Sequence, residues 1–234
     1  MPELPEVETI VRELRNEISG DKISSVDIFR KNPIVQGDLV KFQQDLNGRK
    51  FLDVTRRAKY LIFHLYPRGF LIAHLRMTGK FIVSKYASKP SKYNRLWFHL
   101  KSGRILIFDD LRCFGTLEIQ KTLDDSKSLF KLGIEPLSKE MHSNYFIKKL
   151  SKSKRNIKSI LLDQKIVAGL GNIYVSEILF RSCIHPQSAV RKLNEKDWNK
   201  IIKYTQIILE EAIKNNGTSI SDFRRINDKT GKFQ

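Results

Sequence analysis

The sequence predicts an α+β protein in which an N-terminal helix and an antiparallel β-sandwich are followed by an all-helical domain. Apolar residues recur at helical spacing at the start of the chain, which is typical of an amphipathic helix. Short strand-like runs separated by turn residues then continue to about residue 119, as in antiparallel sandwiches and barrels. After a polar stretch over residues 121–141, the apolar pattern is helical.

The opening helix is marked by an apolar stripe and by residues suited to a first turn. The stripe consists of Val7, Ile10, Val11, Leu14 and Ile18. Pro5 and Glu6 fit a helix start, because proline needs no N–H there and an acid favours the positive end of the helix dipole. The pattern fades at Gly20 and Asp21, so we expect a single amphipathic helix.

Residues 22 to about 119 contain apolar runs of strand length. Ile23, Val26 and Ile28 form the first. The other expected strands cover residues 50–55, 60–66, 70–76, 80–86, 95–101, 104–109 and 115–119. Turn residues separate several of these runs, and the pair at 102–103, Ser-Gly, fits a tight hairpin.

The last part of the chain is expected to be helical. Candidate helices cover residues 143–150, 155–164, 173–182 and 194–215. Asn194 followed by Asp197 resembles a helix start, and Asn216 with Gly217 a stop. We therefore divide the chain into a first domain at 1–125, a linker at 126–142 and a helical domain at 143–234.

The charge balance points to a polyanionic partner. The chain carries 43 Lys and Arg against 25 Asp and Glu, a net charge of +18, and nucleic acid is the commonest such partner of a soluble protein. An anionic membrane is the rival, but the sequence has neither a basic amphipathic terminal helix nor a long apolar stretch. Residues 148–158 hold six Lys or Arg and no acid. Such runs are more often a solvated helix face, yet here we favour phosphate contact.

Cysteine usage and the N-terminus suggest a reducing compartment. Cys113 and Cys183 are far apart and form no CxxC pair, which argues against a disulfide framework and against a zinc site. The first residues are acidic and contain two prolines, unlike a signal peptide. We expect a cytoplasmic protein that needs no metal or other cofactor within this chain.

The N-terminus itself offers a nucleophile. A small residue after the initiator Met usually permits Met removal, which would leave Pro2 with a free secondary amine. Because such an amine has a pKa of about 8, a useful fraction is unprotonated at neutral pH and can attack an aldehyde-like carbon. Glu3 beside it could serve as acid or base. Composition alone favours the plainer interpretation that Pro2 is a helix-entry residue.

Three further clusters combine charge with turn residues. Lys59 enters an apolar strand, where it is either a solvated edge residue or a phosphate ligand. His74 and Met77 precede a turn. They are either a structural imidazole and core filler, or a DNA contact and a wedge for a base stack. Arg112 and Phe114 form either an ion pair beside a core ring, or a guanidinium and ring that fill a hole in DNA.

A glycine-containing turn lies between two expected helices. The Gly-Leu-Gly sequence at 169–171 lacks the third glycine and the preceding strand of a nucleotide-binding loop. It is better interpreted as a tight turn with Asn172 as the N-cap of the next helix. We expect its backbone N–H groups to be able to hold a phosphate.

Taken together, these segments resemble the formamidopyrimidine-DNA glycosylase family. The resemblance spans residues 2–234 and rests on PELPEVETI, RAKY, HLRMTG, DDLRCFG and LLDQKIVAGLGNIYVSE, in that order. It implies a helix-capped β-sandwich followed by a helix–two-turn–helix domain.

The resemblance also implies roles for individual residues. Pro2 would attack C1′ of the damaged nucleotide, Glu3 would protonate the opening deoxyribose, and Lys59 would bind the phosphate beside the lesion. Met77, Arg112 and Phe114 would fill the void in the duplex, with Arg112 facing the orphaned cytosine. The expected DNA-binding set is His74, Met77, Arg112, Phe114, Lys158 and Asn172. The expected contacts to the extruded base are Glu6, Gly217, Thr218, Ser219, Ile220 and Arg224, mostly on the loop at 217–225.

The function implied is repair of damaged double-stranded DNA by a monomer. The enzyme would excise oxidised purines such as 8-oxoguanine and formamidopyrimidines, then nick the abasic site by β,δ-elimination. The alternatives are an endonuclease VIII-like enzyme for oxidised pyrimidines and a DNA-binding protein without catalysis. The family usually continues into a zinc-bearing hairpin with four cysteines, so zinc is expected only if the full gene product carries that module.

Overall fold

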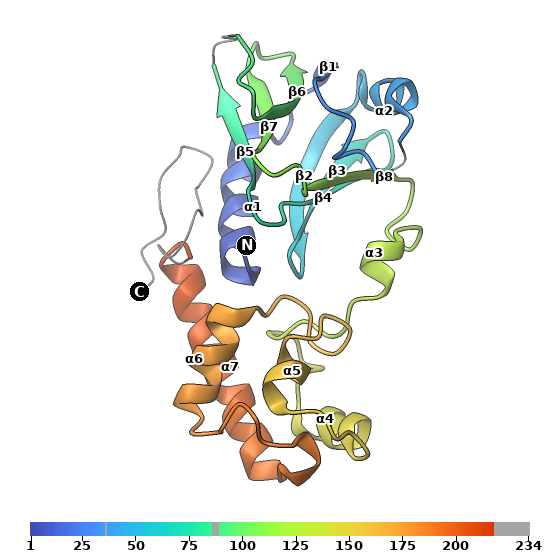
Figure 1. Cartoon of the computed structure of the whole chain (residues 1–234). Helices are drawn as coiled ribbons and strands as arrows, with labels where there is room; N and C mark the ends of the chain where they lie inside the picture. Colours follow the sequence, from blue (N-terminus) through green and yellow to red (C-terminus); the bar gives the residue numbers. More distant parts are fainter. Residues whose placement is uncertain (36, 86–88, 218–234) are drawn as a thin grey trace.

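The chain begins with one helix and then forms two antiparallel sheets (Figure 1). The computed structural model describes residues 1–35, 37–85 and 89–217. The elements of the first part are α1 (Leu4–Ile18), β1 (Ile23–Ile28), α2 (Leu39–Leu46), β2 (Lys50–Arg57), β3 (Tyr60–Tyr66), β4 (Phe70–His74), β5 (Gly79–Ser84), β6 (Asn94–Leu100), β7 (Ile105–Asp110) and β8 (Thr116–Gln120).

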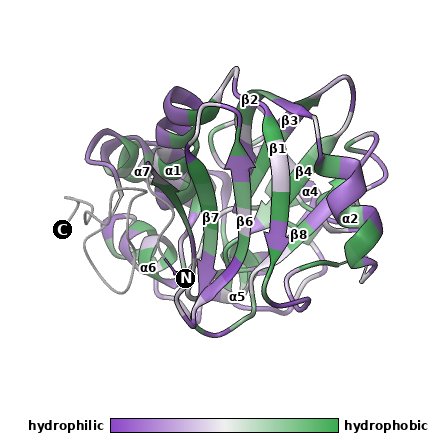
Figure 2. Ribbon diagram, turned by 90° about the horizontal axis from the view of Figure 1, so that it is seen from above, coloured by the Kyte–Doolittle hydropathy of each residue, from purple (hydrophilic) through white to green (hydrophobic). Residues whose placement is uncertain are grey.

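The two sheets confirm the expected sandwich. Strands β1, β6, β7 and β5 form one sheet in that order, and β2, β3, β4 and β8 form the other. The pairs are antiparallel, with Leu100 N–H donating to Arg104 O across the predicted turn between β6 and β7. Strand β7 is largely apolar (Figure 2), and most residues of β4, β6 and β7 are buried, so these strands are covered on both faces.

The second part is helical, also as expected. Its elements are α3 (Lys127–Phe130), α4 (Ser143–Leu150), α5 (Ile157–Leu161), α6 (Asn172–Arg181), a short 3-10 helix (Val190–Lys192) and α7 (Glu195–Lys214). Asn194 caps α7 by accepting from Asp197 N–H, and Gly217 N–H donates to Ala212 O at its end. The sequence therefore located the longest helix to within a residue at each end.

Three expectations need correction. The helix α2 lies where only strands were expected. It was missed from the sequence because it is short and buries just Phe42 and Leu46. The helix α3 interrupts the expected linker. The helix expected at 155–164 covers only Ile157–Leu161, since Asn156 is its N-cap and accepts from Ser159 N–H.

Each part has its own core. The α1 stripe of Val7, Ile10 and Leu14 packs with the inward faces of both sheets. In the helical part, the ring of Phe146 stacks on Trp198 with 4.4 Å between centroids and an angle of 2° between planes. Both rings are almost fully buried, which makes this stack the centre of the second core.

We expect Phe146→Ala to lower the free energy of unfolding by about 3–5 kcal/mol, because the ring leaves a cavity against Trp198. Phe180→Ala is the matched control. Its ring is 78% exposed, so the expected change is within about 0.5 kcal/mol. Urea denaturation of both variants measures the difference, and equal losses would contradict this account of the core.

Candidate active site

The start of α1 docks onto the turn that precedes α6. Pro2 lies just before the start of α1 and is half-buried, and Glu3, the N-cap of α1, is only 4% exposed. The carboxylate of Glu3 accepts hydrogen bonds from Gly171 N–H at 2.6 Å and from Ile173 N–H at 3.0 Å. Leu4 N–H donates to Gly169 O at 3.1 Å. These bonds join the N-terminus to the helical part of the chain.

The glycine turn therefore has a different role from the one expected. The N–H groups of Gly171, at the end of the turn, and of Ile173, in the first turn of α6, donate to Glu3 instead of being available for a phosphate. Gly171 is the N-cap of α6, and Asn172 is an exposed first helical residue, not the N-cap. A Cβ on Gly171 would lie 2.3 Å from Glu3 Oε1, so only glycine permits this close approach.

Lys59 lies beside Glu3 in a buried position. It is 4% exposed, so its interpretation as a solvated edge residue is wrong. Burial lowers the pKa of the Lys59 amine, while the nearby carboxylates of Glu3 and Glu6 act against that decrease. Burial likewise raises the pKa of Glu3, although Lys59 and the backbone N–H donors oppose it. Desolvation thus moves both groups toward their neutral forms.

Glu6 joins the nucleophile region to the end of α7. Its carboxylate accepts from Glu3 N–H at 2.9 Å and from the Tyr174 hydroxyl at 2.6 Å, and burial raises the pKa of that tyrosine. Gly217 is close enough that an added Cβ would lie 3.0 Å from Glu6. The sequence did not single out Tyr174. The one sequence feature that pointed to Tyr174 was its place directly after Gly171–Ile173.

The other expected residues of the lesion-base loop cannot be compared with the structure. Thr218, Ser219, Ile220 and Arg224 lie outside the described residues. Gly217, the last described residue, has a φ of 79°, which favours glycine.

His74 is buried and neutral. It is 5% exposed, and burial lowers its pKa to about 3, helped by the positive charges of Arg76 and Lys59. Its Nδ1 accepts from Arg76 N–H at 3.0 Å, which leaves the proton on Nε2. These contacts fit the structural interpretation, so His74 can meet DNA only as a neutral imidazole.

Met77, Arg112 and Phe114 lie on two tethered turns. Met77 is 44% and Phe114 54% exposed, so neither is core filler. The Arg112 guanidinium lies 4.8 Å from the centroid of the Phe114 ring. Thr78 Oγ1 connects the turns because it donates to Asp110 and accepts from Arg112 N–H at 3.0 Å. The structure thus presents an exposed Met, Arg and Phe together.

The two expected phosphate ligands of the helical part lie on different helices. Lys158 lies in the short helix α5, where its N–H donates to Pro186 O, and Asn172 begins α6. Within the described ranges there is no cluster of three or more His, Cys, Asp or Glu able to hold a metal ion. The described helices include none long and apolar enough to span a membrane.

The buried His74 leads to a prediction about stability and pH. Its pKa is 6.5 ordinarily and about 3 in the folded protein, so the unfolded state takes up the proton first as pH falls. The stabilisation is therefore complete above pH 6.5 and lost between 6.5 and 3, by up to about 1.4 kcal/mol per pH unit. We expect His74→Gln to flatten this decline, which urea denaturation near neutral pH and at about one and two pH units lower would measure.

The control for this prediction is His185→Gln. His185 is exposed, so its replacement is expected to keep the wild-type pH dependence. A His74→Gln variant with the wild-type slope would show that the imidazole is not held neutral by the fold.

Comparison with known proteins identifies the family. The model of the formamidopyrimidine-DNA glycosylase N-terminal domain matches residues 1–117, and that of the H2TH domain of the same enzymes matches residues 132–224. The formamidopyrimidine-DNA glycosylase of Lactobacillus helveticus is 39% identical over 236 residues, covering 100% of this chain and 85% of that protein. The one from Streptococcus pneumoniae R6 is 39% identical over 247 residues, covering 99% and 89%.

Solved structures agree. The Lactococcus lactis Fpg in complex with DNA containing an abasic site has a TM-score of 0.90 and 36% identity, and the alignment covers 97% of this chain and 84% of that one. A mutant of the Lactococcus lactis protein in complex with DNA containing Fapy-dG has a TM-score of 0.91 and 37% identity, with 99% and 85% covered. This chain belongs to the formamidopyrimidine-DNA glycosylase family.

Proposed function

We propose that this protein is a base-excision repair glycosylase that removes oxidised purines from double-stranded DNA and cleaves the resulting abasic site. The observation that carries the proposal is the docked N-terminus: Pro2 follows Met1 directly, and Glu3 is held by two backbone N–H groups next to Lys59. The related Lactococcus lactis structures hold DNA with an abasic site or with Fapy-dG, which supports this substrate class.

The first task of the enzyme is to expose the damaged nucleotide. Turning a base out of a duplex costs a few kcal/mol. We infer that Met77 and Phe114 offset part of that cost by filling the vacated space, and that Arg112 faces the orphaned cytosine. Their exposure and the shared tether through Thr78 support this assignment. Lys158, Asn172 and the neutral His74 are proposed contacts to the DNA backbone.

The chemical step uses the amine of Pro2 once Met1 has been removed. The lone pair of Pro2 N forms a bond to C1′, and the bond from C1′ to the base breaks with its electron pair going to the base. The departing base takes up the proton that the Pro2 nitrogen loses. Glu3 donates a proton to the ring oxygen as the sugar opens to an iminium. Loss of the C2′ proton expels the 3′ phosphate, and a second elimination expels the 5′ phosphate. The raised pKa of Glu3 supports its role as the acid.

Lys59 is a competing amine beside Glu3. We assign it to the phosphate beside the lesion, and burial lowers the pKa of its amine. An N-terminal amine, with an ordinary pKa of about 8, starts closer to its neutral form than a lysine does, which supports Pro2 as the nucleophile.

We infer further that the chain works as a monomer in the cytoplasm, with residues 1–125 and 143–234 as domains joined by 126–142. The net charge of +18 supports electrostatic binding to DNA that weakens with salt. We expect no cofactor in this chain, and zinc only if the gene product extends into a zinc-bearing hairpin.

Borohydride trapping tests the nucleophile. We expect the protein, processed to begin at Pro2, to form a covalent adduct with duplexes containing 8-oxoguanine, a formamidopyrimidine or an abasic site, because borohydride reduces the iminium. Peptide mapping should place the adduct on Pro2. The matched control is protein that retains Met1, confirmed by mass spectrometry, in which the Pro2 nitrogen is an amide and no adduct should form.

Two outcomes would contradict the proposal. An adduct mapped to Lys59 would overturn the assignment of the nucleophile while keeping the enzyme. Absence of both adduct and strand cleavage in the processed protein, with duplex binding intact, would favour the binding-protein alternative.

A further inference from the structure

A short connector, residues 133–135, links the two sides of the active site. It lies between α3 and α4 and pairs with the segment that leads into the glycine turn. Gly133 N–H donates to Gln164 O at 2.8 Å, and Ala168 N–H donates to Ile134 O at 2.9 Å. Because that turn supplies the N–H groups that hold Glu3, the connector supports one side of the site directly.

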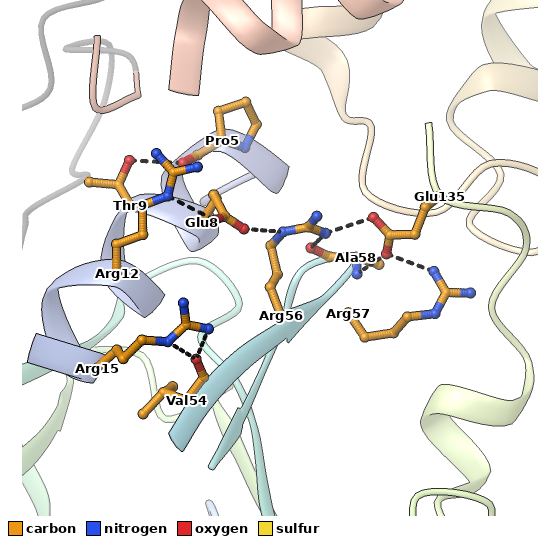
Figure 3. A network of polar contacts seen from close by, with 10 residues as sticks. All are labelled: Pro5, Glu8, Thr9, Arg12, Arg15, Val54, Arg56, Arg57, Ala58 and Glu135. Atoms are coloured by element: carbon orange, nitrogen blue, oxygen red, sulfur yellow. Dashed lines mark hydrogen bonds and ion pairs between the residues drawn. The ribbon is translucent and has the colours of Figure 1, made fainter. Parts of the chain in front are cut away.

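The side chain of Glu135 reaches the other side. Its carboxylate accepts from Arg57 Nη1 at 2.7 Å, Arg56 Nη1 at 2.8 Å and Ala58 N–H at 2.6 Å, so both oxygens are used (Figure 3). Arg56 and Arg57 end β2, and Ala58 begins the two-residue turn to β3, immediately before Lys59. Charge-assisted bonds of this kind are stronger than neutral ones and specify geometry.

The hydrogen bond from Ala58 N–H to Glu135 is made at a residue whose backbone conformation is unfavourable. Ala58 has a φ of 52°, in the left-handed region that costs a residue with a side chain about 1–2 kcal/mol. A carboxylate on its N–H helps to hold this conformation, and the turn then directs Lys59 inward beside Glu3. Arg56 also donates to Glu8 of α1 at 3.0 Å, so the same network reaches the helix that follows Pro2.

We propose that Glu135 is a positioning residue for Lys59, and that the connector keeps Lys59 and Glu3 in register across the two parts of the chain. The inference rests on the proposed function, since it assigns Glu135 a part in that reaction. Glu135 itself bonds to the turn and stands outside the reacting groups. Its effect on the rate should therefore depend on the presence of Lys59.

A double-mutant cycle tests this dependence. The reaction is cleavage of a preformed abasic duplex with enzyme in excess, compared for the wild type, E135Q, K59A and K59A/E135Q. We expect E135Q to lower the rate about tenfold in the wild-type background and less than about threefold in the K59A background, because the positioned group is then absent. The affinity for the duplex should stay within about threefold, because E135Q disturbs at most the one phosphate contact assigned to Lys59, in a chain with a net charge of +18.

The matched control is E140Q. Glu140 is an exposed carboxylate that also lies between α3 and α4, and it interacts electrostatically with Arg57. E140Q therefore removes the same formal charge as E135Q. Its rate should equal that of the wild type. A loss of about tenfold in E140Q would show that charge alone explains the effect and would overturn the proposal.

The remaining outcomes are also decisive. A wild-type rate in E135Q, or an equal loss in the K59A background, would overturn the positioning role. If thermal melting shows that E135Q does not fold, Arg57→Gln removes one donor to Glu135 and is expected to show a smaller coupling to Lys59 of about threefold. Additivity of Arg57→Gln and K59A would count against the proposal. A wild-type protein that neither cleaves nor traps abasic DNA would overturn the proposed function first.

Discussion

The carboxylate of Glu3 accepts hydrogen bonds from two N–H groups that lie 168 and 170 residues further along the chain. This contact ties the first turn of α1 to the start of α6, and so the sandwich to the helical part. Burying a carboxylate is costly unless its oxygens are paired. Here two backbone donors pair the two oxygens, and the charge of the neighbouring Lys59 amine is attractive. The position of Pro2, one residue earlier, depends on this pairing.

Burial and mutual attraction act in opposite directions on the charged groups around Glu3. Lys59 faces Glu3 and Glu6, and attraction alone would keep all three charged. Desolvation outweighs this attraction for Glu3 and Lys59, because the pKa of the acid is raised and that of the amine is lowered. Tyr174 satisfies one oxygen of Glu6. The connector, through Glu135, is proposed to position Lys59 relative to Glu3.

The sequence predicted what local pattern determines and missed what distant contacts determine. Period and turn residues located α1, the strands of the sandwich and the ends of α7. The glycine turn was wrongly expected to offer its N–H groups to a phosphate, because the partner, Glu3, is distant in sequence. The burial of Lys59 was missed for the same reason, as was Glu135, whose donors lie 77 to 79 residues away. The exposure of Met77 and Phe114 is consistent with the turn contexts in which the sequence places them.

The central claim is that the hydrogen bonds from Gly171 and Ile173 N–H to Glu3 position the N-terminal nucleophile. The variant Gly171→Ala tests this claim most directly. An added Cβ would lie 2.3 Å from Glu3 Oε1, so the carboxylate must move. The measurement is the rate of borohydride trapping on abasic duplex by folded Gly171→Ala. The control is folded Gly103→Ala, which strains its own turn (φ 83°) but whose Cβ would meet no neighbour within 4 Å. The account predicts at least about a tenfold slower trapping in Gly171→Ala alone, with duplex affinity retained. Wild-type trapping by a folded Gly171→Ala protein would contradict it.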